Sequence, residues 1–361
     1  MKTVRGWAMG ATLLVPALLA LAVSGPAIGQ GKKKAKLQEW TVPDSPTLPI
    51  DYKVQGEYVG GGVGCQVIAL GGGRFQAVVL PGGLPGAGWD GKHKSLLDGK
   101  HDVDQVVFEP AKGKRKYKAQ KPEEFSATST FPPPGQKDFS ATLVGERLTL
   151  KTNDGKTLEL KKTVRQSPTM GAKPPADATV LFDGKDASEW VGGRADSKTG
   201  WLNTDRKDIR TRRKFNNYTV HAEFLIPFLP DARDQGRGNS GFYQVDLYEV
   251  QILDSFGLDG KNNECGGVYQ RRDSLVNACL PPLTWQTYDI DFTNAVRDGD
   301  KVVKKARITA KLNGITIHDD AEIGTTPGGR DQKEEGTPGP LKFQGHGNVL
   351  QFRNVWVVEK K

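Results

Sequence analysis

One short segment, Tyr248–Asp254, carries the side chains best suited to acid–base chemistry. Successive side chains of an extended strand alternate between two faces, so Glu249 and Gln251 share one face and the apolar residues between them point to the other. A one-residue bulge after Gln251 would return Asp254 to the Glu249 face. A carboxyl group on such a face can take a proton from a bound molecule or return one. We therefore predict that Glu249 lines a cleft on this face; the alternative is a surface carboxylate paired with a lysine or arginine.

The elements that position this segment are short strands in residues 178–361. Several runs alternate apolar with polar residues, the pattern of strands with one packed and one solvated face. Two antiparallel sheets packed face to face in a jelly-roll β-sandwich would bury the apolar sets and leave polar sets on a concave sheet. The expected strands are Thr179–Phe182, Tyr218–Leu225, Ser240–Val245, Tyr248–Leu253, Gln286–Phe292, Ala306–Leu312, Ile315–His318 and Gln351–Val357.

A smaller all-β domain is expected before it, over residues 50–165. Short apolar runs are separated there by glycine-rich or polar turns, and Asp154-Gly155 predicts a hairpin between two of them. No set of His, carboxylate or Cys residues converges in this region. The sequence leaves three roles open for this domain: binding of wall polymer, docking of a partner, or spacing of the second domain from a surface. Residues 166–177 contain three prolines and are expected to be a linker.

The first residues have the layout of a secretory signal. Residues 1–29 combine a basic start, an apolar stretch over Ala8–Val23 and small residues at Ala27 and Gly29, which predicts cleavage after Gly29. A membrane anchor is the alternative, because the apolar stretch approaches spanning length. Residues 30–49 are expected to be a basic, proline-rich tether. The mature chain is predicted to be exported, periplasmic or extracellular, with no membrane span.

The formal charge of +9 does not indicate nucleic-acid binding. Residues 40–172 carry 18 basic against 14 acidic residues, and residues 173–361 carry 27 of each. The excess therefore lies in the leader, the tether and the smaller domain rather than in a basic groove. We predict that nucleic acid is not a partner.

The cysteines and the acidic residues leave two questions open. Cys265 and Cys279 enclose a loop short enough for a disulfide in an exported chain, and the alternative is two half-buried thiols. No cofactor is predicted. Asp254, Asp319 and Asp320 offer oxygen ligands for calcium, but no loop has a calcium-binding pattern.

Six motifs in the second half of the chain occur in an order that resembles a known family. Together they resemble the 3-keto-disaccharide hydrolase domain family, also described as 3-keto-glucoside 1,2-lyases and 3-keto-2-hydroxy-glucal hydratases. The resemblance covers about residues 178–359 and implies a concanavalin A-like sandwich and a carbohydrate substrate. The motifs are Leu181-Phe-Asp-Gly184 with Trp190, Arg237–Tyr243, Tyr248–Ser255, Trp285–Ile290, Asn313-Gly314, and Phe343–Asn348 through Phe352–Trp356.

The Glu249 segment is also similar to the E-x-D-x-x-E strand of retaining laminarinase-type glycosidases, but it departs twice. The central Asp is Gln251 and the final Glu is Asp254. Both changes argue against an ordinary displacement with two carboxylates.

A 3-keto sugar, which the family resemblance implies, allows a different route. The C3 carbonyl acidifies the hydrogen on C2, so a base can form an enolate, the C1 group can leave, and water can add to the 2-hydroxyglycal. Glu249 is the expected base, and His346 the expected acid or enolate donor, since histidine changes charge near neutral pH. A turn-capping role is the alternative for His346. The expected substrate-binding residues are Arg237, Asn239, Gln251, Asp254, Arg353, Trp201 and Tyr243. The alternatives are a loop-tethering role for Arg237, a structural ion pair for Arg353 and core packing for Trp201 and Tyr243.

Three functions follow for such a domain. The first is cleavage of 3-keto-glycosides by elimination and hydration, which implies a separate sugar 3-dehydrogenase that supplies the keto sugar. The second is non-catalytic glycan binding on the same concave face. The third is conventional hydrolysis of a β-glucan, whose signature would be retention of anomeric configuration.

Overall fold

Strands make up 42% and helices 4% of the structure, a computed structural model that describes residues 37–361. The predicted all-β class is therefore confirmed. The expected signal peptide and the start of the tether lie outside the described residues. Within residues 37–361, no helix has the length and apolar character needed to cross a membrane.

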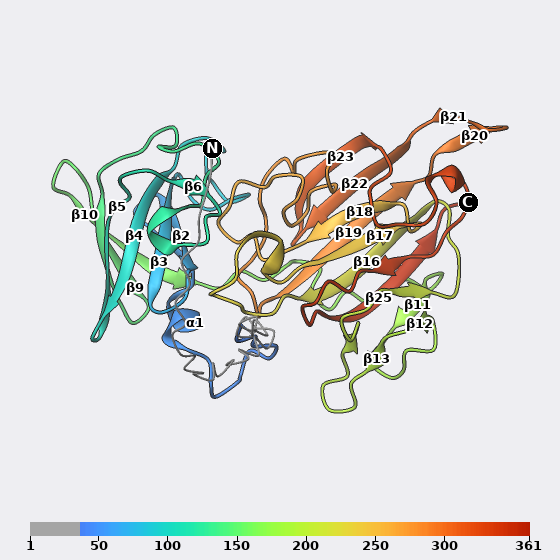
Figure 1. Cartoon of the computed structure of the whole chain (residues 1–361), viewed down its shortest axis with the longest axis horizontal. Coiled ribbons are helices and arrows are strands. Elements are labelled where there is room, and N and C mark those ends of the chain that lie inside the picture. The colour runs from blue at the N-terminus through green and yellow to red at the C-terminus, as the bar shows by residue number, and fades with distance from the viewer. Residues whose placement is uncertain (1–36) are drawn as a thin grey trace, which may run out of the picture. The chain divides into compact units, whose positions relative to one another are not determined.

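Eight antiparallel strands between residues 56 and 163 form a closed barrel (Figure 1). The barrel closes because β1 pairs with β2 on one side and with β10 on the other. In barrel order the strands are β1 (Gly56–Gly60), β10 (Thr157–Thr163), β9 (Arg147–Lys151), β8 (Ser140–Val144), β5 (Gln105–Pro110), β4 (Ser95–Asp102), β3 (Arg74–Pro81) and β2 (Val63–Ala69). The predicted hairpin at Asp154-Gly155 joins β9 to β10 and is confirmed.

The barrel interior is filled by side chains from alternate positions of these strands. Tyr58, Val67, Leu97 and Phe108 are fully buried there. Four short elements flank the barrel: α1 (Ile50–Val54), β6 (Lys116–Tyr117), η1 (Pro122–Glu124) and β7 (Phe125–Ser126). The hydrophobic cluster also includes Leu225, Phe228 and Leu283 from the second half of the chain, so barrel and sandwich share packed side chains.

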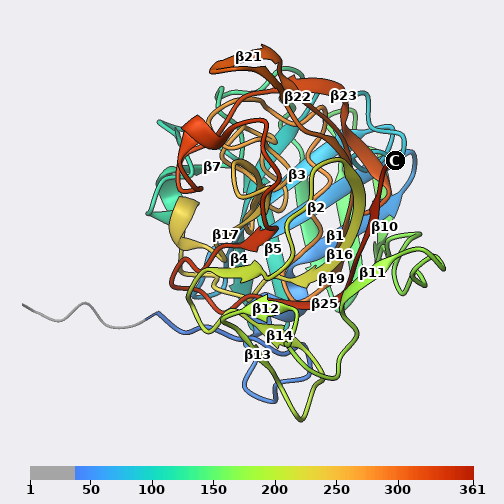
Figure 2. The same ribbon diagram turned by 90° about the vertical axis from the view of Figure 1, so that its right-hand side faces the viewer.

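Residues 179–359 form two antiparallel sheets, as expected for a sandwich (Figures 1 and 2). The larger sheet has the order β13 (Arg194–Ala195), β14 (Leu202–Asn203), β25 (Gln351–Glu359), β16 (Tyr218–Leu225), β19 (Trp285–Thr293), β22 (Ala306–Leu312) and β23 (Ile315–Ile323), with β11 (Thr179–Phe182) also on β25. The smaller sheet has the order β12 (Trp190–Val191), β15 (Ile209–Thr211), β24 (Lys342–Phe343), β17 (Ser240–Gln244) and β18 (Tyr248–Ile252). The remaining elements are η2 (Asp234–Gly236), β20 (Val296–Asp298), β21 (Lys301–Lys304) and η3 (Gln332–Glu334).

Aromatic side chains fill the space between the two sheets. Phe343 of the smaller sheet stacks on Phe352 of the larger one, with ring centroids 3.7 Å apart. Tyr248, Val250 and Ile252 point into the same core. The alternation predicted for this strand therefore directs Glu249 and Gln251 to the outer face of the smaller sheet.

A loop over residues 253–284 leaves β18 and returns to the start of β19. Its middle part runs along the edge of β18, where Gln251 N donates to Gly267 O (2.9 Å) and Tyr269 N donates to Glu249 O (3.1 Å). These bonds occupy backbone groups that an edge strand would otherwise leave unpaired. We call this segment the long loop.

Candidate active site

A small pocket of about 110 Å³ lies on the outer face of the smaller sheet, under the loops that cover it. Five predicted site residues line it: Asn239, Tyr243, Glu249, Gln251 and His346. The remaining lining residues are Gln235, Tyr269, Pro327, Gly328 and Gln344. Strands β17 and β18 thus supply the floor, and loops on several sides supply the walls.

Glu249 occupies the centre of this floor and is 2% exposed. Its carboxyl group lies over Gly241 of the neighbouring strand, where an added Cβ would come within 2.2 Å of Glu249 Oε1. Glycine at 241 is therefore what leaves room for this carboxyl group. Burial raises the pKa of Glu249 to about 7, although Tyr243 and the Lys342 charge favour the ionised form. Such a carboxyl group exchanges its proton near neutral pH.

The Tyr243 hydroxyl can accommodate both protonation states of Glu249. It lies 2.7 Å from Glu249 Oε2 and 2.8 Å from the carbonyl oxygen of Pro327. With Glu249 ionised, the hydroxyl donates to the carboxylate. With Glu249 protonated, the carboxyl group donates to Tyr243, which then donates to Pro327.

A buried lysine lies behind Tyr243. Lys342 Nζ is 3.5 Å from the centroid of the Tyr243 ring and 3.1 Å from Asp246 Oδ1. The Lys342 side chain is fully buried. The ammonium group thus holds the ring by a cation–π contact and places a positive charge near the carboxyl group of Glu249.

Three amide side chains form one wall of the pocket. Gln251 Nε2 donates to Gln235 Oε1 (3.0 Å), and Asn239 Nδ2 donates to Gln235 O (2.9 Å). Asn239 Oδ1 is buried and has no hydrogen-bond partner within residues 37–361. A buried acceptor without a partner is unfavourable, so this atom is suited to accept a hydrogen bond from a ligand hydroxyl.

His346 and Tyr269 lie at the rim of the pocket. His346 is exposed, and Tyr269 is partly exposed. The loop that bears His346 is fixed where Gly345 N donates to Asp208 Oδ1 (3.0 Å). Both side chains can therefore reach a molecule bound over Glu249 from the solvent side.

The barrel supports both loops that form this side of the pocket. In the segment that carries Gln235, Arg233 Nη2 donates to Leu70 O (2.6 Å) and Arg237 Nη1 donates to Ala69 O (3.0 Å), at the end of β2. Lys118, after β6, pairs with Asp234 at 2.7 Å. The loop positions are thus linked to the barrel by hydrogen bonds and an ion pair.

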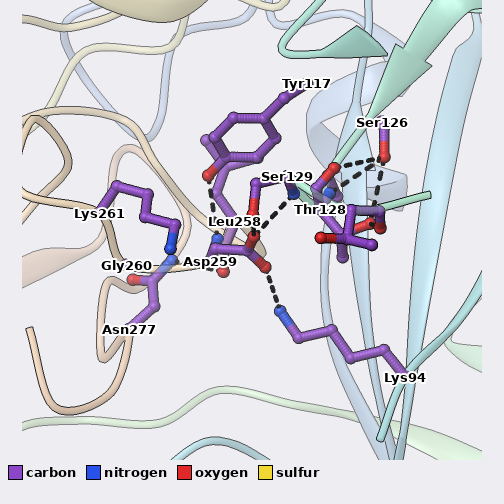
Figure 3. Close-up of polar contacts among 12 residues, drawn as sticks. Lys94, Tyr117, Ser126, Thr128, Ser129, Leu258, Asp259, Gly260, Lys261 and Asn277 are labelled. Carbon is purple, nitrogen blue, oxygen red and sulfur yellow. Dashed lines mark hydrogen bonds and ion pairs between the residues drawn. The ribbon is translucent and has the colours of Figure 1, made fainter. Parts of the chain in front are cut away.

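The long loop is attached to the barrel in the same way (Figure 3). Asp259 accepts hydrogen bonds from Lys94 Nζ (2.9 Å) and from the backbone and hydroxyl of Ser129 (both 2.7 Å). The Tyr117 hydroxyl donates to the buried Glu264 and accepts from Asp259 N (3.2 Å). The loop that carries Tyr269 therefore rests on the barrel.

Arg237 and Asp254, expected to bind substrate, lie outside this pocket. Arg237 Nε donates to Asp254 Oδ2 (2.6 Å), and both side chains are buried. The predicted bulge is wrong: β17 and β18 pair without a register shift and β18 ends at Ile252, so Asp254 turns away toward the barrel. The pair holds two loops together instead of facing the Glu249 side of the sheet.

Arg353 and Trp201 also lie elsewhere. Arg353 Nε donates to Glu223 Oε2 (2.6 Å), and its guanidinium group lies 4.0 Å from the centroid of the Trp285 ring. Trp201 packs edge-on against Trp285, with centroids 5.2 Å apart. Arg353 lies on β25 of the larger sheet and Trp201 directly precedes β14, and neither lines the Glu249 pocket.

The candidate disulfide is not formed in the structure. Cys265 and Cys279 are free and fully buried, as is Cys65. Cys279 Sγ donates to Leu280 O (3.4 Å), and Cys265 Sγ lies 3.5 Å from the Tyr288 hydroxyl. Within residues 37–361, no group of three or more His, Cys, Asp or Glu side chains could hold a metal ion.

Four residues of the site or its support escaped sequence reasoning. Gln235, Tyr269 and Gln344 line the pocket from loops, where no period places a side chain. Lys342 did have a signal, because it precedes the Phe343 motif and alternation directs it away from the core. Its contact with Tyr243 depends on the pairing of β24 with β17, which the sequence does not specify.

Comparisons with known proteins bear on the sandwich half of the chain. The family model described as "3-keto-alpha-glucoside-1,2-lyase-like domain" matches residues 177–358, half of the chain. Three solved structures of candidate glycosyl hydrolases from Parabacteroides distasonis ATCC 8503 are similar to it. The first is 32% identical over 52% of this chain and 85% of that chain, with a TM-score of 0.46.

The second is 21% identical over 51% of this chain and 94% of that chain, with a TM-score of 0.35. The third is 17% identical over 51% of this chain and 99% of that chain, with a TM-score of 0.38. No curated protein matches the chain. The family match begins at residue 177, the last residue of the expected linker, so the barrel lies outside it.

Proposed function

Because the chain belongs to the family of 3-keto-alpha-glucoside-1,2-lyase-like domains, we propose that it cleaves 3-keto-glycosides by removing the proton on C2 and expelling the group on C1. Membership in this family makes it a carbohydrate-active protein. The reaction type is our proposal, and one feature of the pocket supports it most.

That feature is the single carboxyl group in the pocket. Among the described residues that line it, Glu249 is the one carboxylic acid. Conventional glycoside hydrolysis uses two carboxyl groups, separated by about 5–5.5 Å in retaining and about 6.5–9.5 Å in inverting enzymes. The other acid of this strand segment, Asp254, is paired with Arg237. Elimination needs one base, and the pocket offers one.

The proposed reaction has two steps. The ionised Glu249 takes the proton from C2, and the electron pair of that bond forms an enolate with the C3 carbonyl. The enolate then re-forms the carbonyl as the C1–O bond breaks, which leaves a C1–C2 double bond. The leaving oxygen receives a proton. In the second step water adds its oxygen to C1, and C2 regains a proton.

The residues around Glu249 have matching roles. His346 or Tyr269, at the rim, is positioned to protonate the leaving oxygen or to donate to the enolate oxygen. Asn239 and Gln251 provide amide groups for sugar hydroxyls. The Tyr243 hydroxyl donates to Glu249 when the carboxyl group is ionised and to the Pro327 carbonyl when it is protonated. Water is excluded from Glu249 by the same burial that raises its pKa to about 7.

We also propose that another enzyme makes the 3-keto substrate and that this protein is exported. Elimination and hydration together are redox-neutral, so the C3 keto group has to be introduced beforehand. A separate sugar 3-dehydrogenase would do this. The leader-like sequence over residues 1–29 supports export, so that the substrate would be met in the periplasm or outside the cell.

Turnover of a chromogenic 3-keto-glucoside, with the unoxidised glucoside as control, tests the proposal. We expect chromophore release from the keto sugar alone, and a loss of about 10²–10⁴-fold in kcat for Glu249→Gln. Release from the unoxidised sugar would favour conventional hydrolysis. Binding of the keto sugar without release would identify a glycan-binding module.

A further inference from the structure

A cavity of about 500 Å³ lies between the barrel, the segment that follows β10 and the start of β19. Its barrel side carries Tyr52, Lys53 and Lys162, and its sandwich side carries Leu283, Trp285 and Arg353. It shares no residue with the Glu249 pocket. Its volume falls within the range of about 300–1,000 Å³ that small-molecule sites occupy, and boundaries between domains are a common place for such sites.

The charge of the lining residues favours an anionic ligand. Among the described residues that line it, four are cationic, namely Lys53, Lys162, Arg165 and Arg353, and Glu57 is the one acidic residue. Arg165 forms a fork with Glu57 (Nε–Oε2 and Nη2–Oε1 both 2.6 Å). Arg353 is paired with Glu223, as described above.

The two lysines are not neutralised in this way. Within residues 37–361, neither Lys53 nor Lys162 has a carboxylate within ion-pair distance. Lys162 Nζ donates to the backbone carbonyl of Lys53, and both residues line the cavity. Burial lowers the pKa of Lys162, and the charge of Glu146, which lies beyond ion-pair distance, partly offsets this. Two unpaired ammonium groups at a cavity create a positive potential there.

A buried amide donor at the cavity also lacks a partner. Gln55 is 3% exposed; its Oε1 accepts from Ala69 N (3.1 Å) and from Arg237 Nη2 (3.4 Å), whereas its Nε2 has no partner within the described residues. Gln55 lines the cavity. Leaving such a donor unsatisfied costs about 1–3 kcal/mol, so a ligand oxygen that accepts from it would be favoured.

Much of the remaining wall is apolar, with Thr163, Gln166 and Thr284 as its polar residues. Tyr52, Pro282, Leu283 and Trp285 lie among the lining residues. Sugar rings present C–H groups on their faces and hydroxyls on their edges, which matches apolar walls combined with an amide donor and ammonium groups. A simple inorganic anion would leave these apolar walls unused.

We infer that this cavity is a second carbohydrate site, which binds an acidic oligosaccharide through its uronate carboxylate. The carboxylate pairs with Lys53 and Lys162, a hydroxyl oxygen accepts from Gln55 Nε2, and the ring faces pack on the apolar walls. The inference uses the proposed function only to choose a carbohydrate over other organic anions. It gives the barrel, which the family match does not cover, a role in capturing an anionic glycan.

Calorimetric titration of the full chain with digalacturonate tests the inference. We expect saturable binding that weakens as salt rises, because salt screens the ammonium groups, and no binding of the neutral galactobiose. Lys53→Gln should weaken binding about tenfold or more, because it removes a charge-assisted hydrogen bond to the uronate. Gln55→Glu should weaken it by a similar factor, because the new carboxylate repels the uronate. Lys53 is exposed, and Glu at 55 retains the acceptor for Ala69 N, so both variants are expected to fold.

Lys161→Gln is the matched control, because it makes the same Lys-to-Gln change on neighbouring β10, at a residue that does not line this cavity. It should bind as the wild type does. Equal affinity of Lys53→Gln and the wild type would overturn the inference, as would no binding or displacement by an equal concentration of sulfate. Digalacturonate should also bind unchanged to Glu249→Gln. Loss of binding there would place the uronate in the Glu249 pocket and contradict a second site, whether or not the 3-keto sugar is cleaved.

Discussion

The buried carboxyl group of Glu249, which is hydrogen-bonded to Tyr243, lowers the stability of the folded protein at neutral pH. Burial raises its pKa to about 7 from the usual 4.5, so the folded protein binds this proton more tightly than the unfolded chain does. Its contribution to stability is therefore present below about pH 4.5 and is lost as the pH rises through 7. A base ready to act at neutral pH is thus destabilising there.

We expect Glu249→Gln to raise the free energy of unfolding by up to about 3 kcal/mol at pH 8 and to change it little near pH 4.5. Denaturant unfolding at both pH values measures the difference. Glu159→Gln, at an exposed position of β10, is the control and should show no such trend. An equal effect of Glu249→Gln at both pH values would mean that its pKa is not raised.

The cysteines provide a second prediction about single residues. All three are free and buried, and burial raises the pKa of the Cys65 thiol to about 12. Alkylation without reductant should therefore add no label to the folded protein and three labels after unfolding, as measured by mass spectrometry. A single label after unfolding would show that Cys265 and Cys279 had formed the disulfide that their spacing allows.

At the scale of elements, the sequence predicted the longer strands of the sandwich but did not predict β4 of the barrel. Its sequence, Ser95–Asp102, is mainly polar at one end and contains Gly99, which normally weakens a strand. In the barrel Gly99 lies under the Phe108 ring, where an added Cβ would come within 2.4 Å of a ring carbon. The glycine is therefore required by a contact between two strands, which a single strand's pattern cannot show.

We expect Gly99→Ala to destabilise the protein by about 1–3 kcal/mol, because the Phe108 ring or the backbone must move. Gly324→Ala is the control, since the nearest atom to its added Cβ is 3.9 Å away and belongs to the Arg271 side chain. Thermal unfolding compares the two. A Gly99→Ala variant as stable as the control would show that the barrel can move the Phe108 ring without loss.

The same limit explains what the sequence could say about the site. Strand alternation was sufficient to place Glu249 and Gln251 on one face, away from the core. It did not predict that β18 ends at Ile252, so the expected return of Asp254 to the Glu249 face was wrong. Closure of the barrel was equally hidden, because β1 and β10 pair across about a hundred residues of sequence.

At the scale of the whole molecule, the barrel and the sandwich are joined through the loops that form the pocket. The long loop contributes Tyr269 to the site and Asp259 to the barrel contact (Figure 3). We expect Asp259→Ala to increase hydrogen exchange in the long loop and to raise KM for the 3-keto-glucoside. Asp273→Ala is the control, because the bonds of Asp273 to the described residues stay within the same loop, to Lys261 and Asn262. Unchanged exchange in Asp259→Ala would show that the loop holds its position without the barrel.

The central claim is that the bond between C2 and its hydrogen breaks during cleavage. The most direct test compares cleavage of a 3-keto-glucoside that carries deuterium at C2 with cleavage of the unlabelled sugar, in ordinary water, with Glu249→Gln to measure spontaneous exchange. We expect slower cleavage of the deuterated sugar and loss of its deuterium from the product, because Glu249 removes that atom and C2 regains a proton from water. Equal rates together with full retention of deuterium would show substitution at C1 and contradict the elimination mechanism.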